Sequence, residues 1–201
     1  AIAKGTEGLE EGEVVQLFSH NNQFIAIGHY QIGTIAIRVL TFKNEAIDQE
    51  FWEKSIESAA NLRKNLGLID NPKNTIYRLI HGEGDFLPGL GVDCYGDTAV
   101  MQAHSVGMHF ARVNIANAIV KVLDGRIKNV YYKSETTLPY KADLEQENGF
   151  IIGDDGETIA KENGLNFQID WLRGQKTGFF IDQRDNRSLV EHYSKGKSVL
   201  N

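Results

Sequence analysis

The sequence has a single cysteine, no long uncharged apolar run and no excess of basic residues, and each shortage excludes a class of protein. Cys94 has no second cysteine with which to form a disulfide within the chain. No segment has the about 20 apolar residues of a membrane span or the apolar core of a secretory signal. We therefore predict a cytoplasmic protein without a membrane segment.

The net charge of −6 argues against a protein whose whole surface binds nucleic acid, although a local basic strip does not show in that sum. The composition, with 41% hydrophobic and 24% charged residues, is typical of a globular protein of one or two domains. The chain begins "AIAKG", without an initiator methionine, and ends in "SVLN", which predicts an apolar strand just opening after a helix. We expect a segment of a longer chain, cut at both ends.

Short β-rich runs with polar turns between them fill residues 1–42. The runs "GEVVQLFS", "FIAIGHY" and "TIAIRVLTF" predict three strands of a small barrel. Four polar residues in or near these runs either contact phosphates or simply face solvent: Lys4, His20, His29 and Arg38.

The spacing of apolar residues changes in residues 43–74, where they recur every three to five positions. This spacing predicts an amphipathic helix that links two domains, with Asp48 as its N-cap and Gly67 at its C-terminal end. The apolar face is expected to contain Ile47, Phe51, Ile56, Ala59, Ala60 and Leu66.

Strand and helix patterns alternate through residues 75–170 and predict an α+β domain in the order strand, strand, helix, strand, strand. A tight hairpin turn is expected at Gly96 and Asp97, and "ENG" is expected to join the last two strands. One helix is expected over "GMHFARVNIANAIVKVLDG", ending at Gly125. Its apolar positions are Phe110, Val113, Ala116, Ile119, Val120 and Leu123.

The glycine-rich stretch "HGEGDFLPGLGVD" matches no phosphate-binding spacing and favours a shaped structural turn. Its acids Glu83 and Asp85 either form a carboxylate pair for hydrolysis or bond to nearby backbone amides.

Cys94 is interpreted as a buried strand residue rather than a nucleophile. The histidines have no cysteine partners at metal spacing, so no metal site is expected.

The segment "KTGFFIDQRDNR" is unusually dense in hydrogen-bonding groups. Asp182 is the expected N-cap of a helix of roughly ten residues that ends at Gly196. Arg184 and Arg187 then lie three apart on one helix face. The segment is either a capped helix start with a solvated face or a loop built to hold a ligand, and its density favours the ligand.

Three stretches in this order, "YRLIHGEGDFLPGLGVDCYGD", "KTGFFIDQRDNR" and "GKSVLN", resemble bacterial S-adenosylmethionine (SAM)-dependent RNA methyltransferases of the ribosomal large-subunit cytosine-C5 type. The resemblance covers essentially the whole chain. It implies a partial PUA-like β-barrel in residues 1–42, a linking helix in 43–74, a central α+β domain in 75–170 and the start of a Rossmann-like methyltransferase domain in 171–201. This chain then resembles an amino-terminal fragment of such a protein.

The resemblance also implies ligands and sites. SAM is the cofactor, ribosomal RNA is the partner, a homodimer is possible, and the product is 5-methylcytosine in 23S rRNA. The implied cofactor-binding residues are Thr177, Asp182, Gln183 and Arg184. The expected RNA-binding residues are Lys176 and Arg187, together with Lys4 and Arg38 from the first module.

The cysteine nucleophile is expected downstream of Asn201, and Cys94 does not match it. Two other functions stay open at this point. One is a stand-alone PUA-type RNA-binding adaptor without catalysis, and the other is a hydrolase that uses Glu83 and Asp85.

Overall fold

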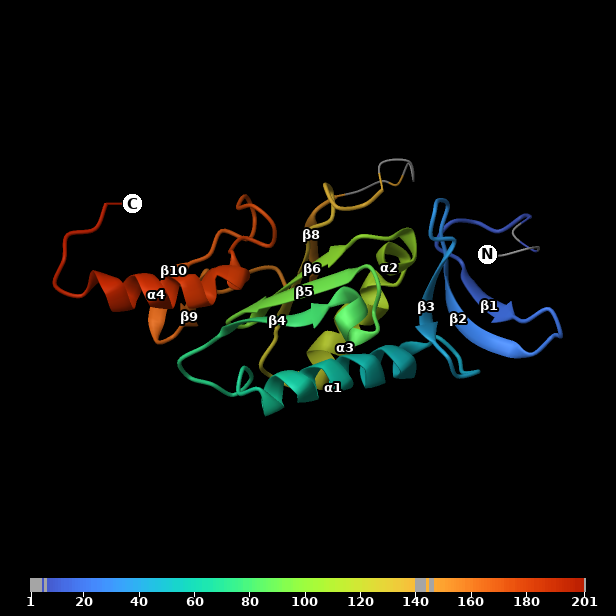
Figure 1. The fold of residues 1–201 in the computed structure, drawn as a ribbon, viewed down its shortest axis with the longest axis horizontal. Helices are drawn as coiled ribbons and strands as arrows, with labels where there is room; N and C mark the ends of the chain where they lie inside the picture. Colours follow the sequence, from blue (N-terminus) through green and yellow to red (C-terminus); the bar gives the residue numbers. More distant parts are fainter. Residues whose placement is uncertain (1–4, 6, 140–143, 145–146, 201) are drawn as a thin grey trace.

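The computed structural model describes residue 5 and residues 7–139, 144 and 147–200. Three parts follow one another along the longest axis (Figure 1): an N-terminal three-stranded sheet, a central five-stranded sheet with its helices, and helix α4 (Arg184–Ser194) at the opposite end. The fold is mixed α and β, as predicted. Across the described residues, no helix has the length and apolar character needed to cross a membrane.

The N-terminal sheet consists of β1 (Val14–Phe18), β2 (Phe24–Tyr30) and β3 (Ile37–Thr41), antiparallel in that order. The three predicted strands are confirmed, as an open sheet. Gly28 in β2 is required by a close approach, because a Cβ there would collide with the carbonyl oxygen of Arg38. Gly28 therefore allows β2 and β3 to pack closely at Arg38.

Helix α1 (Gln49–Asn65) has the predicted N-cap, since the Asp48 carboxylate accepts a hydrogen bond of 3.1 Å from the Phe51 amide. Gly67 has φ +68, the left-handed conformation expected after a helix end. Leu66 was predicted on the apolar face but is exposed, because it lies past the last helical turn.

The central sheet has the order β4 (Ile76–His81), β5 (Leu90–Tyr95), β6 (Thr98–Ala103), β7 (Asn129–Tyr132) and β8 (Gly149–Ile152). Only β6 and β7 pair in parallel. The tight turn is confirmed, with Tyr95 opposite Thr98. Three strands precede the helical region, whereas the predicted order had two.

The helix predicted after β6 is divided into α2 (Val106–Phe110) and α3 (Arg112–Val122). The break at Ala111 changes the helical phase, so Phe110 and Val113 lie exposed instead of in the core. Gly125 ends this region in the left-handed conformation, as expected.

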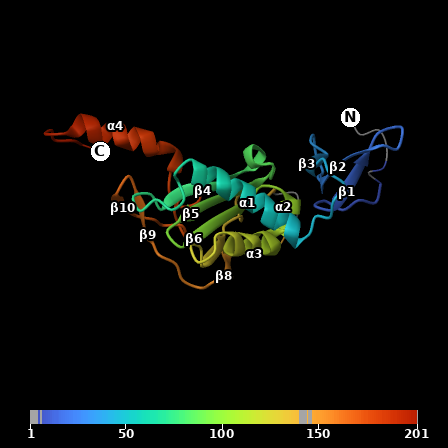
Figure 2. The same ribbon diagram turned by 90° about the horizontal axis from the view of Figure 1, so that it is seen from below.

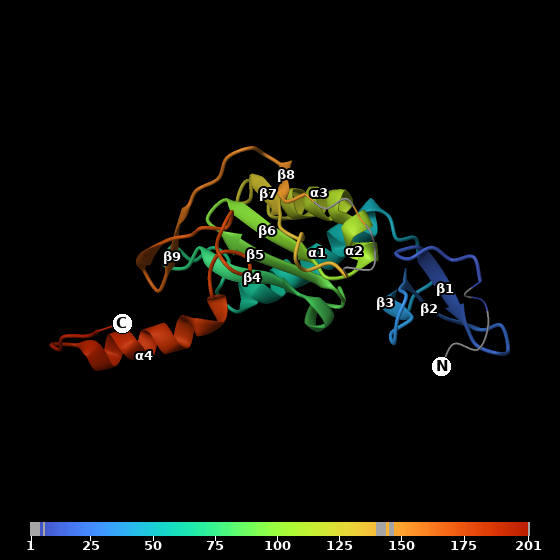
Figure 3. The same ribbon diagram turned by 90° about the horizontal axis from the view of Figure 1, so that it is seen from above.

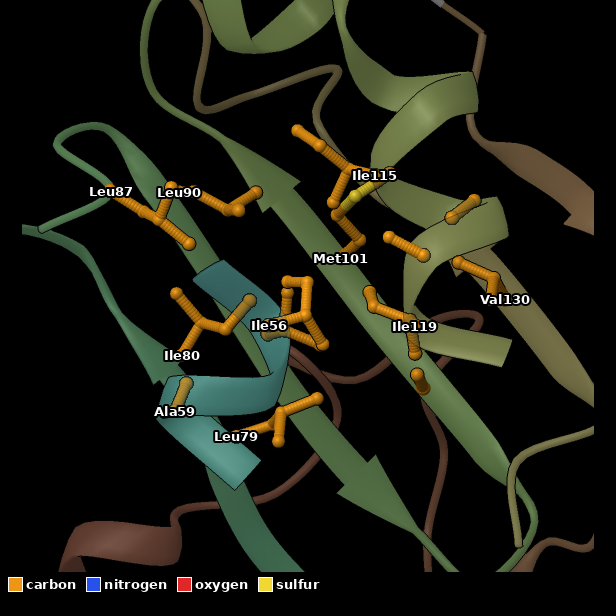
Figure 4. Packing of buried hydrophobic residues seen from close by; sticks show 14 of the residues in the cluster. Ile56, Ala59, Leu79, Ile80, Leu87, Leu90, Met101, Ile115, Ile119 and Val130 are labelled. Carbon is orange, nitrogen blue, oxygen red and sulfur yellow. The ribbon is translucent and has the colours of Figure 1, made fainter. Parts of the chain in front are cut away.

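Helices α1 and α3 cover one face of the central sheet (Figures 2 and 3). The core lies between these two helices and the sheet, and it includes Ile56 of α1, Met101 of β6 and Ile119 of α3 (Figure 4). Each of these three side chains is fully buried, and burying one such side chain contributes about 2 kcal/mol.

Residues 153–183 form a second, smaller cluster with the opposite face of the sheet, centred on Tyr131 and Trp171. The segment contains the hairpin of β9 (Ile159–Glu162) and β10 (Leu165–Gln168), joined as predicted by Asn163 and Gly164. Both turn residues have positive φ, which suits an Asn-Gly turn.

The C-terminal part differs from prediction in two ways. Asp182 is not the N-cap of α4, because it lies within the short 3-10 helix η3 (Ile181–Gln183) and Gln183 precedes α4. Residues 198–200 form no strand, because a strand needs a hydrogen-bonded neighbour and no described strand lies beside them. Helix α4 projects beyond the sheet (Figures 1 and 3), and residues 188–193 are all exposed.

Candidate functional site

Thr177 is at the centre of a buried polar network. Its hydroxyl donates to Oδ2 of Asp93 at 2.6 Å, so the Tyr95 hydroxyl, 2.7 Å away, must donate to Thr177. Burial raises the pKa of Tyr95 and keeps that proton in place. Asp93 in turn accepts two hydrogen bonds, of 2.8 and 2.9 Å, from Arg78 on the neighbouring strand. The network therefore connects the "KTGFF" segment to a guanidinium at the surface.

Glu162 of β9 binds both arginines of the α4 start. Arg187 donates from Nε and Nη2 to the two oxygens of this buried carboxylate at 2.6 and 2.8 Å. Arg184 lies 3.4 Å from the same carboxylate and also donates to the Ile76 carbonyl. The Arg187 guanidinium also lies 4.3 Å from the ring centre of Phe179. We call Glu162, Arg184 and Arg187 the carboxylate clamp.

The carboxylate clamp bears on two site predictions. Arg184 and Arg187 were expected to contact cofactor and RNA, but their side chains are only 20% and 28% exposed and their donors point to protein acceptors. A buried carboxylate with two guanidinium partners is compensated in charge. In this structure the two arginines hold the start of α4 in place.

Lys176, Asp182 and Gln183 lie at the surface close to the clamp. Lys176 Nζ is 3.5 Å from an Asp182 oxygen and 4.6 Å from the ring centre of Phe180. The pKa of Asp182 is lowered, first by a hydrogen bond from Gln183 and also by Lys176. These three side chains remain accessible to a ligand.

A cavity of about 310 Å³ lies where the N-terminal sheet meets the central sheet. Arg38 comes from β3, Arg78 and His81 from β4, and the glycine-rich stretch contributes its backbone. We call it the junction cavity; its polar side chains are Arg38, Arg78, His81, Glu83, Gln102, His104 and Thr177. Two predicted site residues that are far apart in sequence, Arg38 and Thr177, therefore line one cavity.

Charge in the junction cavity is arranged around two guanidinium groups. Arg38 donates to Gln31 at 2.6 Å and lies 3.3 Å from Glu83, whose side chain is 73% exposed at the rim. The pKa of His104 is lowered, first by partial burial and then by the positive charges of Arg78 and Arg38. His104 is accordingly neutral at pH 7, with one nitrogen that donates and one that accepts.

The glycine-rich stretch forms the 3-10 helix η1 (Gly82–Asp85) and a turn, as the structural interpretation predicted. Asp85 accepts a 2.6 Å hydrogen bond from the His81 amide and pairs with buried Arg63, with Nη2 2.8 Å from Oδ2. Glu83 pairs instead with Arg38. The two acids have separate partners, so the geometry does not support a catalytic carboxylate pair.

The remaining candidates have structural roles or lie outside the described residues. Cys94 is buried, and burial raises the pKa of its thiol to about 12, which agrees with the predicted inert strand residue. His29 is also buried and faces no phosphate site, because it packs on α2 and Trp52. Lys4 lies outside the described residues. In the described part of the chain, no three His, Cys, Asp or Glu side chains are placed to hold a metal ion.

The residues that sequence reasoning missed include Arg78, Asp93 and Tyr95 of the Thr177 network, Glu162 of the carboxylate clamp and His104 of the junction cavity. Arg78 and Asp93 did carry a signal, because each is a charged residue inside an apolar strand, in "IYRLI" and "GVDCY". His104 was considered only as a metal ligand. Glu162 precedes an Asn-Gly turn, where an acid is usually solvated, so nothing local marked it.

A comparison with models of protein families matches the first part of the chain. Residues 1–42 match the family model of a PUA-like domain, the range that contains the N-terminal sheet. The match ends at residue 42, before the mixed α/β region begins.

The relatives extend this likeness over nearly the whole chain. The chain is 37% identical over 196 residues, 96% of its length, to ribosomal RNA large subunit methyltransferase I of Aliivibrio fischeri. Proteins of the same name from Alteromonas mediterranea and Vibrio vulnificus are 37% and 34% identical over 193 residues, 94% of the chain. The chain spans 48% of the length of each of these relatives.

Two solved structures share the fold. A Streptococcus mutans protein assigned as a SAM-dependent methyltransferase superposes with a TM-score of 0.74 at 22% identity, over 90% of this chain and 46% of that chain. SMU.776, assigned as a methyltransferase and solved in complex with SAH, gives the same TM-score and identity over 92% of this chain and 46% of its own. At this level of identity the likeness establishes the fold.

Proposed function

We propose that this protein is the RNA-binding and substrate-presenting front part of a SAM-dependent methyltransferase that acts on large-subunit ribosomal RNA in the cytoplasm. The observation that carries the proposal is the 37% identity, over 96% of the chain, to a ribosomal RNA large subunit methyltransferase. The PUA-like match of residues 1–42 and the guanidinium groups of the junction cavity support its RNA-binding part. The product, 5-methylcytosine in 23S rRNA, rests on the motif resemblance.

The predicted cofactor residues differ in whether their side chains already have protein partners. Asp182 and Gln183 are accessible and are proposed to contact the cofactor, which supplies the methyl group when bound. Thr177 and Arg184 are held by protein partners, so their proposed role is to hold this segment in position.

The predicted RNA residues divide in the same way. Lys176 and Arg38 are proposed to contact the RNA backbone, where charge positions a strand without reading its sequence. Arg187 is proposed to hold α4 through the carboxylate clamp. No residue of the described chain is proposed as nucleophile, since Cys94 is buried with its thiol protonated. A tethered RNA-binding module would raise the local concentration of substrate at a catalytic domain.

The test uses the complete product of the gene, with labelled SAM and deproteinised large-subunit rRNA. Methyl transfer to this rRNA is expected, with 5-methylcytidine as the labelled nucleoside in mass spectrometry. Label in another base would contradict the product, and RNA binding with neither SAM binding nor methyl transfer would establish the adaptor instead. Sedimentation of the same protein tests the homodimer.

A further inference from the structure

We propose that the junction cavity and the adjacent side chain of Phe86 form a binding site for an unpaired nucleotide of RNA, with its phosphate in the cavity and a base stacked on Phe86. The proposal rests on the proposed function, since it names where the RNA is held. It would add a binding site on the central domain to the RNA contacts expected of the PUA-like module.

Phe86 presents a large apolar ring to solvent at the end of η1, and packing does not explain this exposure. Its side chain is 77% exposed, so the ring gains little from burial. Its backbone has φ +59 and ψ +24, the left-handed region that bulky side chains avoid. The turn that ends η1 requires this conformation, with the Phe86 amide donating to the Glu83 carbonyl, but it does not require a large apolar ring. An exposed aromatic ring at a position that glycine or asparagine would fill more easily is available as a contact surface for a ligand.

The surface around Phe86 has the chemistry of a single-strand binding site. A second hollow, of about 720 Å³, is lined by Phe86, Phe42 and Pro88 and by the cations Arg38 and Lys43. Aromatic rings beside cations bind unpaired nucleotides by stacking and by attraction of the phosphates. Arg38 and Glu83 line both hollows, so the aromatic surface continues into the junction cavity.

The junction cavity suits a phosphate group. Arg38 and Arg78 supply guanidinium donors and His104 a neutral imidazole donor. The negative charge of Asp93 is buried beneath Arg78, which it orients with two hydrogen bonds. Glu83 is the competing group, but it is largely exposed and meets Arg38 through a single 3.3 Å contact, so a phosphate can replace it.

Gly91 supplies a separate indication that the space is used. Its φ is not in the left-handed region, and a Cβ built on it would meet no atom closer than 3.9 Å. Neither backbone nor packing therefore requires glycine at this strand position, where glycine weakens a strand. A bulkier side chain here would extend into the junction cavity towards His104 and Gln102.

The experiment measures the affinity of the whole chain for a fluorescein-labelled single-stranded oligouridylate by anisotropy, with a duplex of equal length for comparison. Single-stranded RNA is expected to bind more tightly than duplex. Phe86→Asn is expected to weaken binding about fivefold or more, because a stacked base is lost. Tyr193→Asn, which removes an exposed aromatic from α4, is the matched control and should leave affinity unchanged.

The charged variants have expected effects of opposite sign. Arg38→Gln should weaken binding, whereas Glu83→Gln should strengthen it because the competing carboxylate is gone. Both variants break the ion pair between Arg38 and Glu83. If this ion pair only stabilised the fold, the two variants would change the RNA affinity in the same direction. Gly91→Val should weaken binding without changing any charge, and thermal unfolding checks that each variant folds.

Two outcomes are distinguished. If the unaltered protein binds single-stranded RNA and both Phe86→Asn and Gly91→Val bind it equally well, this site is overturned while the proposed function stands. If the unaltered protein binds neither RNA, the RNA-binding role under the proposed function fails as well.

Discussion

Arg187 and Glu162, 25 positions apart in the sequence, are joined by two hydrogen bonds of 2.6 and 2.8 Å. The carboxylate belongs to the β9–β10 hairpin and the guanidinium to α4. Because Glu162 also faces Arg184, one buried side chain holds the first turn of α4 against the central domain.

Glu162→Gln is expected to lower the free energy of unfolding by about 3 kcal/mol, because two partly buried guanidinium groups lose their counter-charge. Urea unfolding measures the change, and hydrogen exchange of residues 184–194 should rise in the variant. Glu191→Gln removes the same charge from an exposed site on α4 and should change neither. Equal unfolding midpoints for both variants would show that the clamp contributes nothing.

Thr177→Val is expected to cost about 2 kcal/mol, because Asp93 loses a donor and the Tyr95 hydroxyl loses its acceptor in a buried site. Thr177→Ser keeps the hydroxyl and should retain most of the stability. Thermal unfolding of the three proteins measures the difference. If serine is as destabilising as valine, the methyl group rather than the network accounts for the effect.

The free energy of unfolding should depend on pH through His29, which lies in β2 and packs against α2 and against Trp52 of α1. Burial lowers the pKa of His29 from 6.5 to about 4 in the folded protein, so the unfolded chain binds the proton more readily. The contribution of neutral, buried His29 to the free energy of unfolding is therefore fully present above pH 6.5. It falls as the pH drops from 6.5 towards 4, and it is lost below pH 4. The loss amounts to about 3 kcal/mol.

Urea unfolding between pH 7 and pH 4, followed by tryptophan fluorescence, measures this dependence. His29→Gln cannot titrate and should show a flatter profile over the same interval. The assignment to His29 would be wrong if the two profiles ran parallel.

Gly107→Ala should destabilise the protein by about 1–3 kcal/mol, because the new Cβ would collide with the ring of His29. His29→Ala in the same chain removes the ring and should recover part of that loss. The double-mutant cycle measures the coupling between the two positions, and additive effects would exclude a direct contact.

Features that depend on near neighbours in sequence were predictable. Asp48 caps α1 through an amide three residues away, and Gly96 and Asn163 mark turns through their own backbone preferences. The three strands of the N-terminal sheet followed from their apolar pattern in the same way.

Features that depend on distant partners were not predictable. Thr177 and Asp93 are 84 positions apart, so neither sequence neighbourhood shows their hydrogen bond. Arg184 and Arg187 were predicted to bind ligands, and their shared partner Glu162 could not be foreseen because it comes from another element. Asp182 failed as a cap because it lies inside η3, beside Lys176 and Gln183, a local geometry that the capping pattern does not encode.

Helix α4 is about 16 Å long, its first turn is bonded to Glu162, and residues 188–193 are exposed. Mechanically, α4 is a rod anchored at one end, at the carboxylate of Glu162. A force applied at the far end of α4 produces a torque at this anchor, and the torque is proportional to the length of the helix. The stiffness with which α4 holds its angle is therefore set by a few charged hydrogen bonds at one end.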